Sequence, residues 1–180
     1  MAERGIELGI IAGARILKDP IIRAFPIGII NFHPGLIPEA RGLDALLWSV
    51  YKGVPLGVTA HLIDSRVDLG RILVRETIPI YGDDTMLDLS ERLHEKQLEL
   101  LPKAIELAVA GKWTCVAEPG TYNRKMNPDL ERQAYAMLPE YVKHFATDSS
   151  QTGPMNSSRS GGKANPTEVP SAATGANGRE

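Results

Sequence analysis

Residues 28–35, Gly-Ile-Ile-Asn-Phe-His-Pro-Gly, decide how the chain is interpreted, because an apolar run stops there at a polar turn. The run over Gly28–Phe32 predicts a buried strand, which His33-Pro34-Gly35 brings to an end. Asn31 and His33 therefore stand two residues apart at the carboxyl end of that strand. Side chains two apart in a strand point to the same side, so the amide and the imidazole are predicted to project together.

The same alternation of apolar runs and helical periodicity continues on both sides of this stretch. Further strands are predicted over Leu8–Ala12, Gly57–Ile63 and Arg71–Ile80. Helices are predicted over Lys18–Phe25, over Leu43–Tyr51 and from Asp84 to Gly111, with Thr85 as a cap and Pro102 as the point where the long helix kinks or splits. Strands interleaved with helices predict an α/β fold with a partly parallel sheet, although four strands are few for that class.

Composition narrows the class of protein further. The chain has 180 residues, 43% of them hydrophobic, and a formal net charge of −2, which fits one globular domain and not a polybasic nucleic-acid or membrane binder. No apolar run approaches the roughly 20 residues that cross a bilayer. The single cysteine, Cys115, cannot form an internal disulfide, so we expect a cytoplasmic protein in which this residue belongs to the core.

The C-terminal stretch 147–180 differs from the rest, since it is rich in Gly, Ser, Thr, Pro and Asn and almost free of large apolar side chains. Such a segment buries too little surface to offset its ordering entropy, so it is predicted to be a disordered tail. Residues 1–146 are then left to form the folded domain.

An amide donor beside an imidazole suits chemistry at a carbonyl group. The amide of Asn31 could hydrogen-bond a developing oxyanion, while the imidazole of His33 could move a proton near neutral pH. The alternative is structural: the histidine would cap the following turn, and the asparagine would satisfy loop backbone. Spacing alone leaves both open.

A second polar cluster occupies Ile63–Gly70, between two predicted strands, and includes Asp64 and Asp68. These carboxylates could orient an imidazole or help to bind a ligand, and the alternative is a polar hairpin turn. His61 and His33 could join them as metal ligands, but no characteristic ligand spacing favours this. The chain also contains neither a phosphate-binding P-loop motif nor a dinucleotide fingerprint.

Taken together, Asn31-x-His33-Pro34, Leu36-Ile37-Pro38 and Arg41-Gly42, followed by the Asp-x-Gly loop Val67–Gly70, resemble the formyltransferase family that uses 10-formyltetrahydrofolate. That family includes glycinamide ribonucleotide transformylase, methionyl-tRNA formyltransferase and the sugar N-formyltransferases. The resemblance covers roughly Ile10–Leu107. It implies a Rossmann-like domain in which the βα units that normally precede the strand at Leu8–Ala12 are missing.

The resemblance also implies an activity, the transfer of a formyl group from the co-substrate 10-formyltetrahydrofolate to a primary amine, without a metal. Asn31 would stabilise the oxyanion, His33 would pass a proton to the leaving nitrogen, and Asp68 would hold the imidazole and organise a water. The pterin ring would lie against the second polar cluster, at Ile63, Asp64, Val67 and Gly70. The implied acceptor is a small molecule, a nucleotide-linked amino sugar or glycinamide ribonucleotide, and neither a nucleic acid nor a membrane.

Two other functions share these residues. A hydrolase would use water as the acceptor and release formate, and a truncated paralogue would bind folate without turnover. The missing units would also leave an exposed sheet edge, which is an association hazard or an association site, and a homodimer is one way to cover it.

Overall fold

The computed structural model describes residues 5–11, 17–64, 68 and 70–147. Of the predicted tail, only Thr147 is among them, so the tail stays a prediction. The secondary structure, in chain order, is β1 (Leu8–Ile11), α1 (Asp19–Ile22), β2 (Gly28–His33), α2 (Ala45–Lys52), β3 (Gly57–Leu62), β4 (Arg71–Thr77), α3 (Met86–Val109) and α4 (Pro128–Phe145).

The four strands form one sheet in the order β1-β2-β3-β4. β1 pairs with β2 in parallel, whereas β2, β3 and β4 follow one another antiparallel, so the predicted α/β fold with a partly parallel sheet is confirmed. β4 ends at Thr77 and not at Ile80 as predicted. Pro79 lies within the predicted extension, and a proline has no N–H to donate to a strand ladder.

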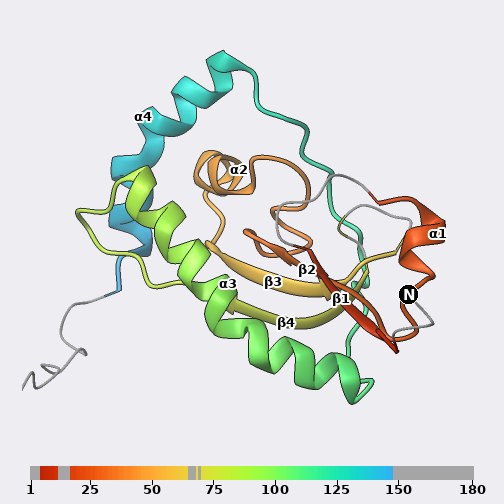
Figure 1. The fold of residues 1–180 in the computed structure, drawn as a ribbon. Helices are drawn as coiled ribbons and strands as arrows, with labels where there is room; N and C mark the ends of the chain where they lie inside the picture. The colour runs from red at the N-terminus through yellow and green to blue at the C-terminus, as the bar shows by residue number, and fades with distance from the viewer. Residues whose placement is uncertain (1–4, 12–16, 65–67, 69, 148–180) are drawn as a thin grey trace, which may run out of the picture. The chain divides into compact units, whose positions relative to one another are not determined.

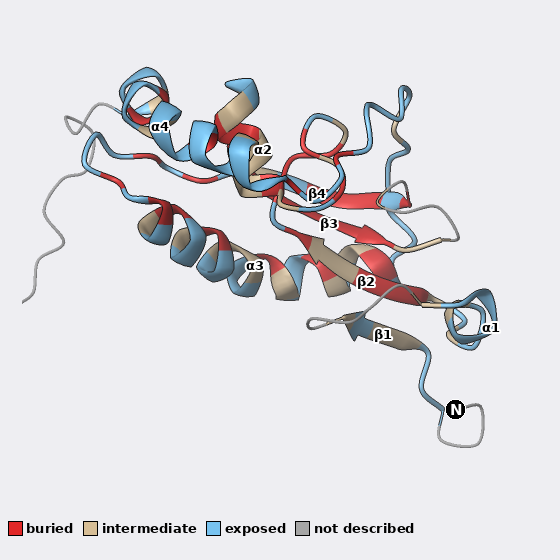
Figure 2. Cartoon of the chain, turned by 90° about the horizontal axis from the view of Figure 1, so that it is seen from above, coloured by how far each residue is buried: buried red, intermediate tan, exposed pale blue. Residues whose placement is uncertain are grey.

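Helices lie on both sides of the sheet. α3 runs across one face, and α2 lies beside α4 on the other side (Figures 1 and 2). The core between these layers is apolar and continuous. Its most deeply buried members include Ile30, Val58, Ala60, Leu62, Leu89 and Ala104.

α3 begins at a capping box. The Thr85 hydroxyl accepts from the Asp88 backbone N–H, and the Asp88 carboxylate accepts from the Thr85 N–H. The helix then continues through Pro102, so of the kink or split predicted there, the split was wrong. The carbonyl that loses its donor belongs to Leu98, which is 60% exposed, so water can replace the missing bond.

α4 was not predicted from the sequence. Asn127 caps it by accepting from the backbone N–H groups of Asp129 and Leu130, and Pro128 occupies its first turn. The Tyr141 hydroxyl donates to the Val54 carbonyl, which ties the helix to the turn after α2. Among the helices of the described residues, none combines the length and apolar character needed to span a bilayer.

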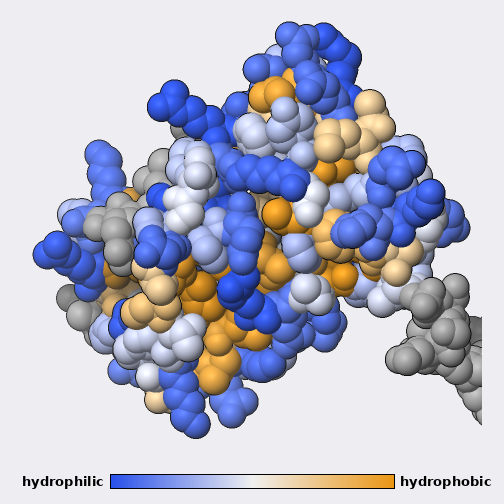
Figure 3. Space-filling model, turned by 180° about the vertical axis from the view of Figure 1, so that it is seen from behind, coloured by the Kyte–Doolittle hydropathy of each residue, from blue (hydrophilic) through white to orange (hydrophobic). Residues whose placement is uncertain are grey.

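The β1 edge is the least buried part of the sheet. None of its four residues is fully buried, and Ile10 is 48% exposed. On the face of the molecule shown in Figure 3, apolar side chains gather among hydrophilic ones. Among the described residues, β1 is the outermost strand of the sheet, at the edge that was predicted to be exposed.

Candidate functional site

The pairing of β2 with β3 brings the polar side chains of the two strands together. Asn31 lies opposite His61, and His33 lies opposite Thr59. These alternate positions share one face of the sheet, while Ile30 and the other intervening residues face the core. A bulge between Ala60 and His61 shifts the register against β4, a feature that often re-aims side chains near functional sites.

Asn31 and His61 are joined by a hydrogen bond. The Asn31 Nδ2 amide donates to His61 Nε2 at 3.2 Å, which assigns the proton of the neutral ring to Nδ1. His61 is only 1% exposed, and burial lowers its pKa to about 4 although the charge of Asp68 opposes the shift. His61 is therefore a neutral acceptor at physiological pH, and it leaves the second Asn31 N–H available to another group.

The His33 ring is held by a hydrogen bond at one nitrogen and faces a carboxylate with the other. Its Nε2 donates to the Ala40 carbonyl at 2.8 Å, which assigns the lone pair of the neutral ring to Nδ1. Nδ1 lies 3.9 Å from the nearer carboxylate oxygen of Asp68, too far for a hydrogen bond but close enough for an ion pair with the protonated ring. His33 is 4% exposed, so the space between its ring and Asp68 is partly shielded from water.

Asp68 lies between the two histidines. Its Oδ1 is 3.8 Å from His61 Nε2, and its Oδ2 accepts from the Gly42 backbone N–H at 3.1 Å. The backbone of Asp68 is left-handed, with φ of 49°, a conformation that aspartate tolerates better than most residues and that recurs at functional sites. The structure thus brings the three residues proposed for catalysis together, with His61 as a fourth member.

The loop after β2 is fixed by Thr59, a buried residue that the sequence did not single out. Its hydroxyl donates to the Gly35 carbonyl at 2.8 Å and accepts from the Ile37 N–H at 3.1 Å. One side chain, opposite His33 in the sheet, therefore makes hydrogen bonds to two backbone groups of the loop, the Gly35 carbonyl and the Ile37 N–H. The loop geometry expected from its prolines and glycines rests on this contact.

A cavity of about 650 Å³ opens beside His33. The start of α2 lines one side of it, including Leu43 and Leu46, while Ser90, His94 and Gln97 of α3 line the other. His94 is exposed and faces this cavity. The cavity offers an apolar wall, three polar groups and access to the imidazole, which suits a small polar ligand.

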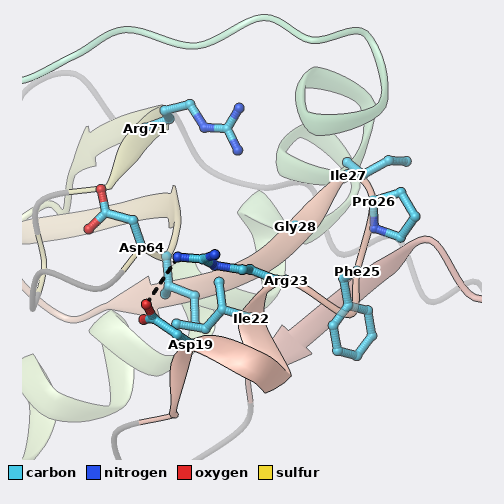
Figure 4. Close-up of a pocket in the computed structure, with 10 residues that line it drawn as sticks. Asp19, Ile22, Arg23, Phe25, Pro26, Ile27, Gly28, Asp64 and Arg71 are labelled. Atoms are coloured by element: carbon cyan, nitrogen blue, oxygen red, sulfur yellow. Dashed lines mark hydrogen bonds and ion pairs between the residues drawn. The ribbon is translucent and has the colours of Figure 1, made fainter.

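A second pocket, of about 410 Å³, lies where α1 meets the ends of β2, β3 and β4. Ile63 and Asp64, two of the residues expected at the pterin ring, help to line it. Figure 4 shows Asp64 and Arg71 on one side and Arg23, which follows α1, on another. Of the other two expected residues, Gly70 is buried and is not part of the lining, and Val67 lies outside the described residues.

The metal site weighed from the sequence has no counterpart among the described residues, since no group of three or more His, Cys, Asp or Glu side chains there is arranged to hold an ion. His61 contacts Asn31 directly and Asp68 at ion-pair distance. Its position opposite Asn31 follows from strand register, which spacing along the chain does not give.

Comparison with known proteins shows which family the chain resembles. A family model described as formyl transferase matches residues 1–105. The chain is 33% identical over 103 residues to the phosphoribosylglycinamide formyltransferase of Bacillus subtilis (strain 168), covering 56% of this chain and 53% of that protein. It is 33% identical over 113 residues to the trifunctional purine biosynthetic protein adenosine-3 of Chironomus tentans, covering 62% of this chain and 8% of that protein.

Among solved structures, the chain resembles the formyltransferase PseJ from Anoxybacillus kamchatkensis, crystallised with UDP-4,6-dideoxy-4-formamido-L-AltNAc and tetrahydrofolate. The TM-score is 0.59 with 28% sequence identity, over 77% of this chain and 75% of that one. The curated relatives are longer than the matched region: the chain spans about half of the Bacillus enzyme and under a tenth of the Chironomus protein.

Proposed function

Since the chain belongs to the formyl transferase family, we propose that it transfers a formyl group from 10-formyltetrahydrofolate to a primary amine of a small molecule. The observation that carries the proposal is the convergence of Asn31, His33 and Asp68 at one end of β2, beside a cavity that reaches His33. An amide donor, an imidazole and a carboxylate are the groups that acyl transfer between two nitrogens requires.

The reaction begins when the lone pair of the uncharged amine attacks the formyl carbon. A C–N bond forms, and the carbonyl oxygen becomes an oxyanion in a tetrahedral intermediate. The bond between that carbon and the folate nitrogen then breaks, the amine loses a proton, and the folate nitrogen gains one. The protein has to stabilise the oxyanion and move the proton.

Asn31 supplies the oxyanion donor. One of its two amide hydrogens is engaged by His61, which fixes the side-chain orientation and leaves the other hydrogen for the oxyanion. Because this donor is oriented before the reaction, it does not have to reorganise as charge develops. A single donor of this kind contributes about 2.7–4 kcal/mol of transition-state stabilisation.

His33 and Asp68 move the proton. The hydrogen bond from His33 Nε2 to Ala40 leaves Nδ1 as the basic nitrogen, and the Asp68 carboxylate faces it. A proton taken up on Nδ1 forms an ion pair with Asp68, which stabilises the imidazolium until the proton passes to the leaving nitrogen. A water bridging the 3.9 Å separation would complete the relay.

Each of the two cavities would bind one of the two substrates. The 410 Å³ pocket at Ile63 and Asp64 would take the pterin end of the folate, together with Val67 and Gly70 in the same loop. The 650 Å³ cavity beside His33 would take the acceptor, with Ser90, His94 and Gln97 as its hydrogen-bonding groups. Acceptors carrying a ribose or a nucleotide-linked amino sugar fit such a polar lining, and a nucleotide-linked formamido sugar is the ligand of the PseJ structure.

The test is a turnover assay with 10-formyltetrahydrofolate and a panel of amines, in which both the formylated amine and formate are measured. Asn31→Ala should lower turnover about 10²–10³-fold, and His33→Ala about 10²–10⁴-fold. His144→Ala, an exposed histidine on α4, serves as the matched control and should leave turnover unchanged.

Other outcomes would point to other functions. Formate release that does not depend on an amine would identify a hydrolase. Folate binding, seen as a raised unfolding temperature, without any turnover would identify a binding protein. Full activity of the His33→Ala variant would overturn the proposed mechanism whatever the substrate.

A further inference from the structure

The segment 119–126 lies beyond the region that the family model matches, yet it contacts the loop that follows β2. The backbone of Asn123 pairs with that loop in two directions: its N–H donates to the Arg41 carbonyl, and its carbonyl accepts from the Leu43 N–H, both at 2.9 Å. Gly42, between these two residues, forms a parallel bridge with Asn123. The segment therefore adds a short strand-like pairing to loop 41–44.

Further contacts tie the same segment to α2. The indole N–H of Trp48 donates to the Arg124 carbonyl at 2.8 Å, and the Asp44 carboxylate accepts from the Met126 N–H at 2.8 Å. Met126 is itself buried. Because these bonds reach both the loop and the first turns of α2, the segment is held at two separate places.

The side chain of Asn123 is 3% exposed and makes one hydrogen bond. Its Oδ1 accepts from Lys52 Nζ at 2.6 Å, and its Nδ2 has no hydrogen-bond partner. Partial burial lowers the pKa of Lys52, whose ammonium also lies 5.5 Å from the centre of the Trp48 ring. The side chain of Asn123 is therefore held through its oxygen, by Lys52, and not through its amide nitrogen.

Gly42 connects these contacts of Asn123 to Asp68. The Gly42 N–H that donates to the Asp68 carboxylate belongs to the residue bridged with Asn123. The fit is tight, since a Cβ atom on Gly42 would lie 2.2 Å from the Asn123 carbonyl oxygen. A displacement of segment 119–126 would thus move the only backbone donor recorded for Asp68 among the described residues.

We propose that Asn123 and Lys52 are positioning residues, which hold loop 41–44 so that the Gly42 N–H keeps the Asp68 carboxylate between His33 and His61. The catalytic part of this inference rests on the proposed function. The structural part, the coupling of Asn123 to Gly42, holds or fails independently of turnover.

The experiment compares four variants of the full chain. Asn123→Leu keeps the branching of the side chain at Cγ and removes the oxygen, whereas Asn123→Asp keeps an oxygen for Lys52 and replaces only the unpartnered Nδ2. Lys52→Met removes the ammonium at an exposed position, so it carries the test if Asn123→Leu does not fold. Arg124→Ala is the matched control, because its side chain is exposed and only its backbone carbonyl contacts Trp48.

Two quantities are measured: hydrogen exchange of the Gly42 amide by NMR, and kcat and KM with 10-formyltetrahydrofolate. In Asn123→Leu and Lys52→Met, the Gly42 amide should exchange at least about tenfold faster. In the same variants, kcat should fall about 10–100-fold with KM for the folate nearly unchanged. Asn123→Asp and Arg124→Ala should behave like the unaltered chain.

The outcomes separate the two proposals. If Gly42 exchange is unchanged in both Asn123→Leu and Lys52→Met, the positioning role is overturned. If exchange accelerates while kcat stays within twofold, the contact exists but does not serve the reaction, and the inference fails as well. If the unaltered chain shows no turnover at all, the proposed function fails, and the exchange data still decide whether Asn123 and Lys52 hold Gly42.

Discussion

β3 and β1 are both short apolar strands of one sheet, but their burial differs sharply. All six residues of β3 are buried, whereas none of the four residues of β1 is. β3 has a strand on each side and α3 across one face, while β1 pairs, among the described strands, with β2 alone. Figure 2 shows the difference as a change from red in β3 to tan and blue in β1.

The difference in burial between β3 and β1 coincides with a difference in the functions proposed for the residues around them. The side chains proposed to act on the formyl group are Asn31 and His33 of β2 and Asp68, whose carboxylate accepts from the Gly42 N–H. His61 of β3, which orients Asn31, is buried. The pocket expected to receive the folate is lined largely by α1 and the chain that follows it, on the exposed side. Reacting groups need fixed geometry, and dense packing supplies it. We therefore expect substitutions to be costly around β3 and tolerated around β1.

A glycine in each strand gives the largest expected contrast. A Cβ on Gly57 of β3 would lie 2.3 Å from the Glu76 carbonyl oxygen and 2.9 Å from the Thr77 Cα, which are backbone atoms of the neighbouring strand. A Cβ on Gly9 of β1 would meet only side-chain atoms, of Ile29 and Phe25, at 3.1 Å.

Gly57→Ala should therefore lower the free energy of unfolding by about 3 kcal/mol or more. Gly9→Ala should change it by about 1 kcal/mol or less, because side chains can shift. Urea titrations of both variants, followed by circular dichroism, measure this. Equal losses would show that the two strands are packed alike and would remove the contrast.

A pair of large apolar residues gives the next contrast. Leu62 of β3 is 1% exposed, and Ile10 of β1 is 48% exposed. Leu62→Ala should cost about 2–4 kcal/mol, from lost burial and the cavity left behind. Ile10→Ala should cost less than about 1 kcal/mol, since half of its surface is already in water. A large loss for Ile10→Ala would mean that β1 is covered in solution, for example by a second copy of the chain.

The strands and the long helix could be predicted from the sequence because their signals are local. Apolar runs located all four strands, and Thr85 with periodic leucines located α3. The predicted split at Pro102 did not occur, because Leu98, whose carbonyl loses its donor, is exposed and water can replace the lost hydrogen bond. The position of Cys115 was also wrong: it was expected in the core and is exposed.

The candidate site was predicted in part, for a physical reason. Asn31 and His33 are neighbours along one strand, so their alignment follows from pleat geometry alone. His61 was weighed only as a metal ligand, because its place beside Asn31 depends on the register of β2 against β3. Asn123 could not be predicted from the sequence at all. It lies 81 residues after Gly42 in the chain, and the two residues pair only in the folded structure. Asn127-Pro128 was a local signal for α4 and could have been used.

Two ion pairs provide the smallest contrast, and the one that depends on pH. The Asp84 carboxylate accepts from both Arg92 amino groups, at 2.7 and 2.8 Å, with its side chain 4% exposed. The Arg23–Asp19 pair of α1 is longer, at 3.4 Å, and its side chains are 81% and 50% exposed. Asp84→Asn should cost about 1–3 kcal/mol at pH 7, and Asp19→Asn less than about 0.5 kcal/mol.

The pH dependence of the Asp84→Asn cost distinguishes an ion pair from mere packing. Burial alone would raise the pKa of Asp84, but hydrogen bonds from Arg92 and from the Tyr81 N–H, with the charge of Arg92, outweigh it and hold the pKa below 3.8. A carboxyl whose pKa is lower in the folded state stabilises fully above its unfolded value and loses that contribution as pH falls through the folded value. The difference in unfolding free energy between Asp84→Asn and the unaltered chain should therefore shrink below about pH 4. A difference that stays constant down to pH 3 would mean that the charge of Asp84 contributes nothing, and that this part of the buried side is held by packing alone.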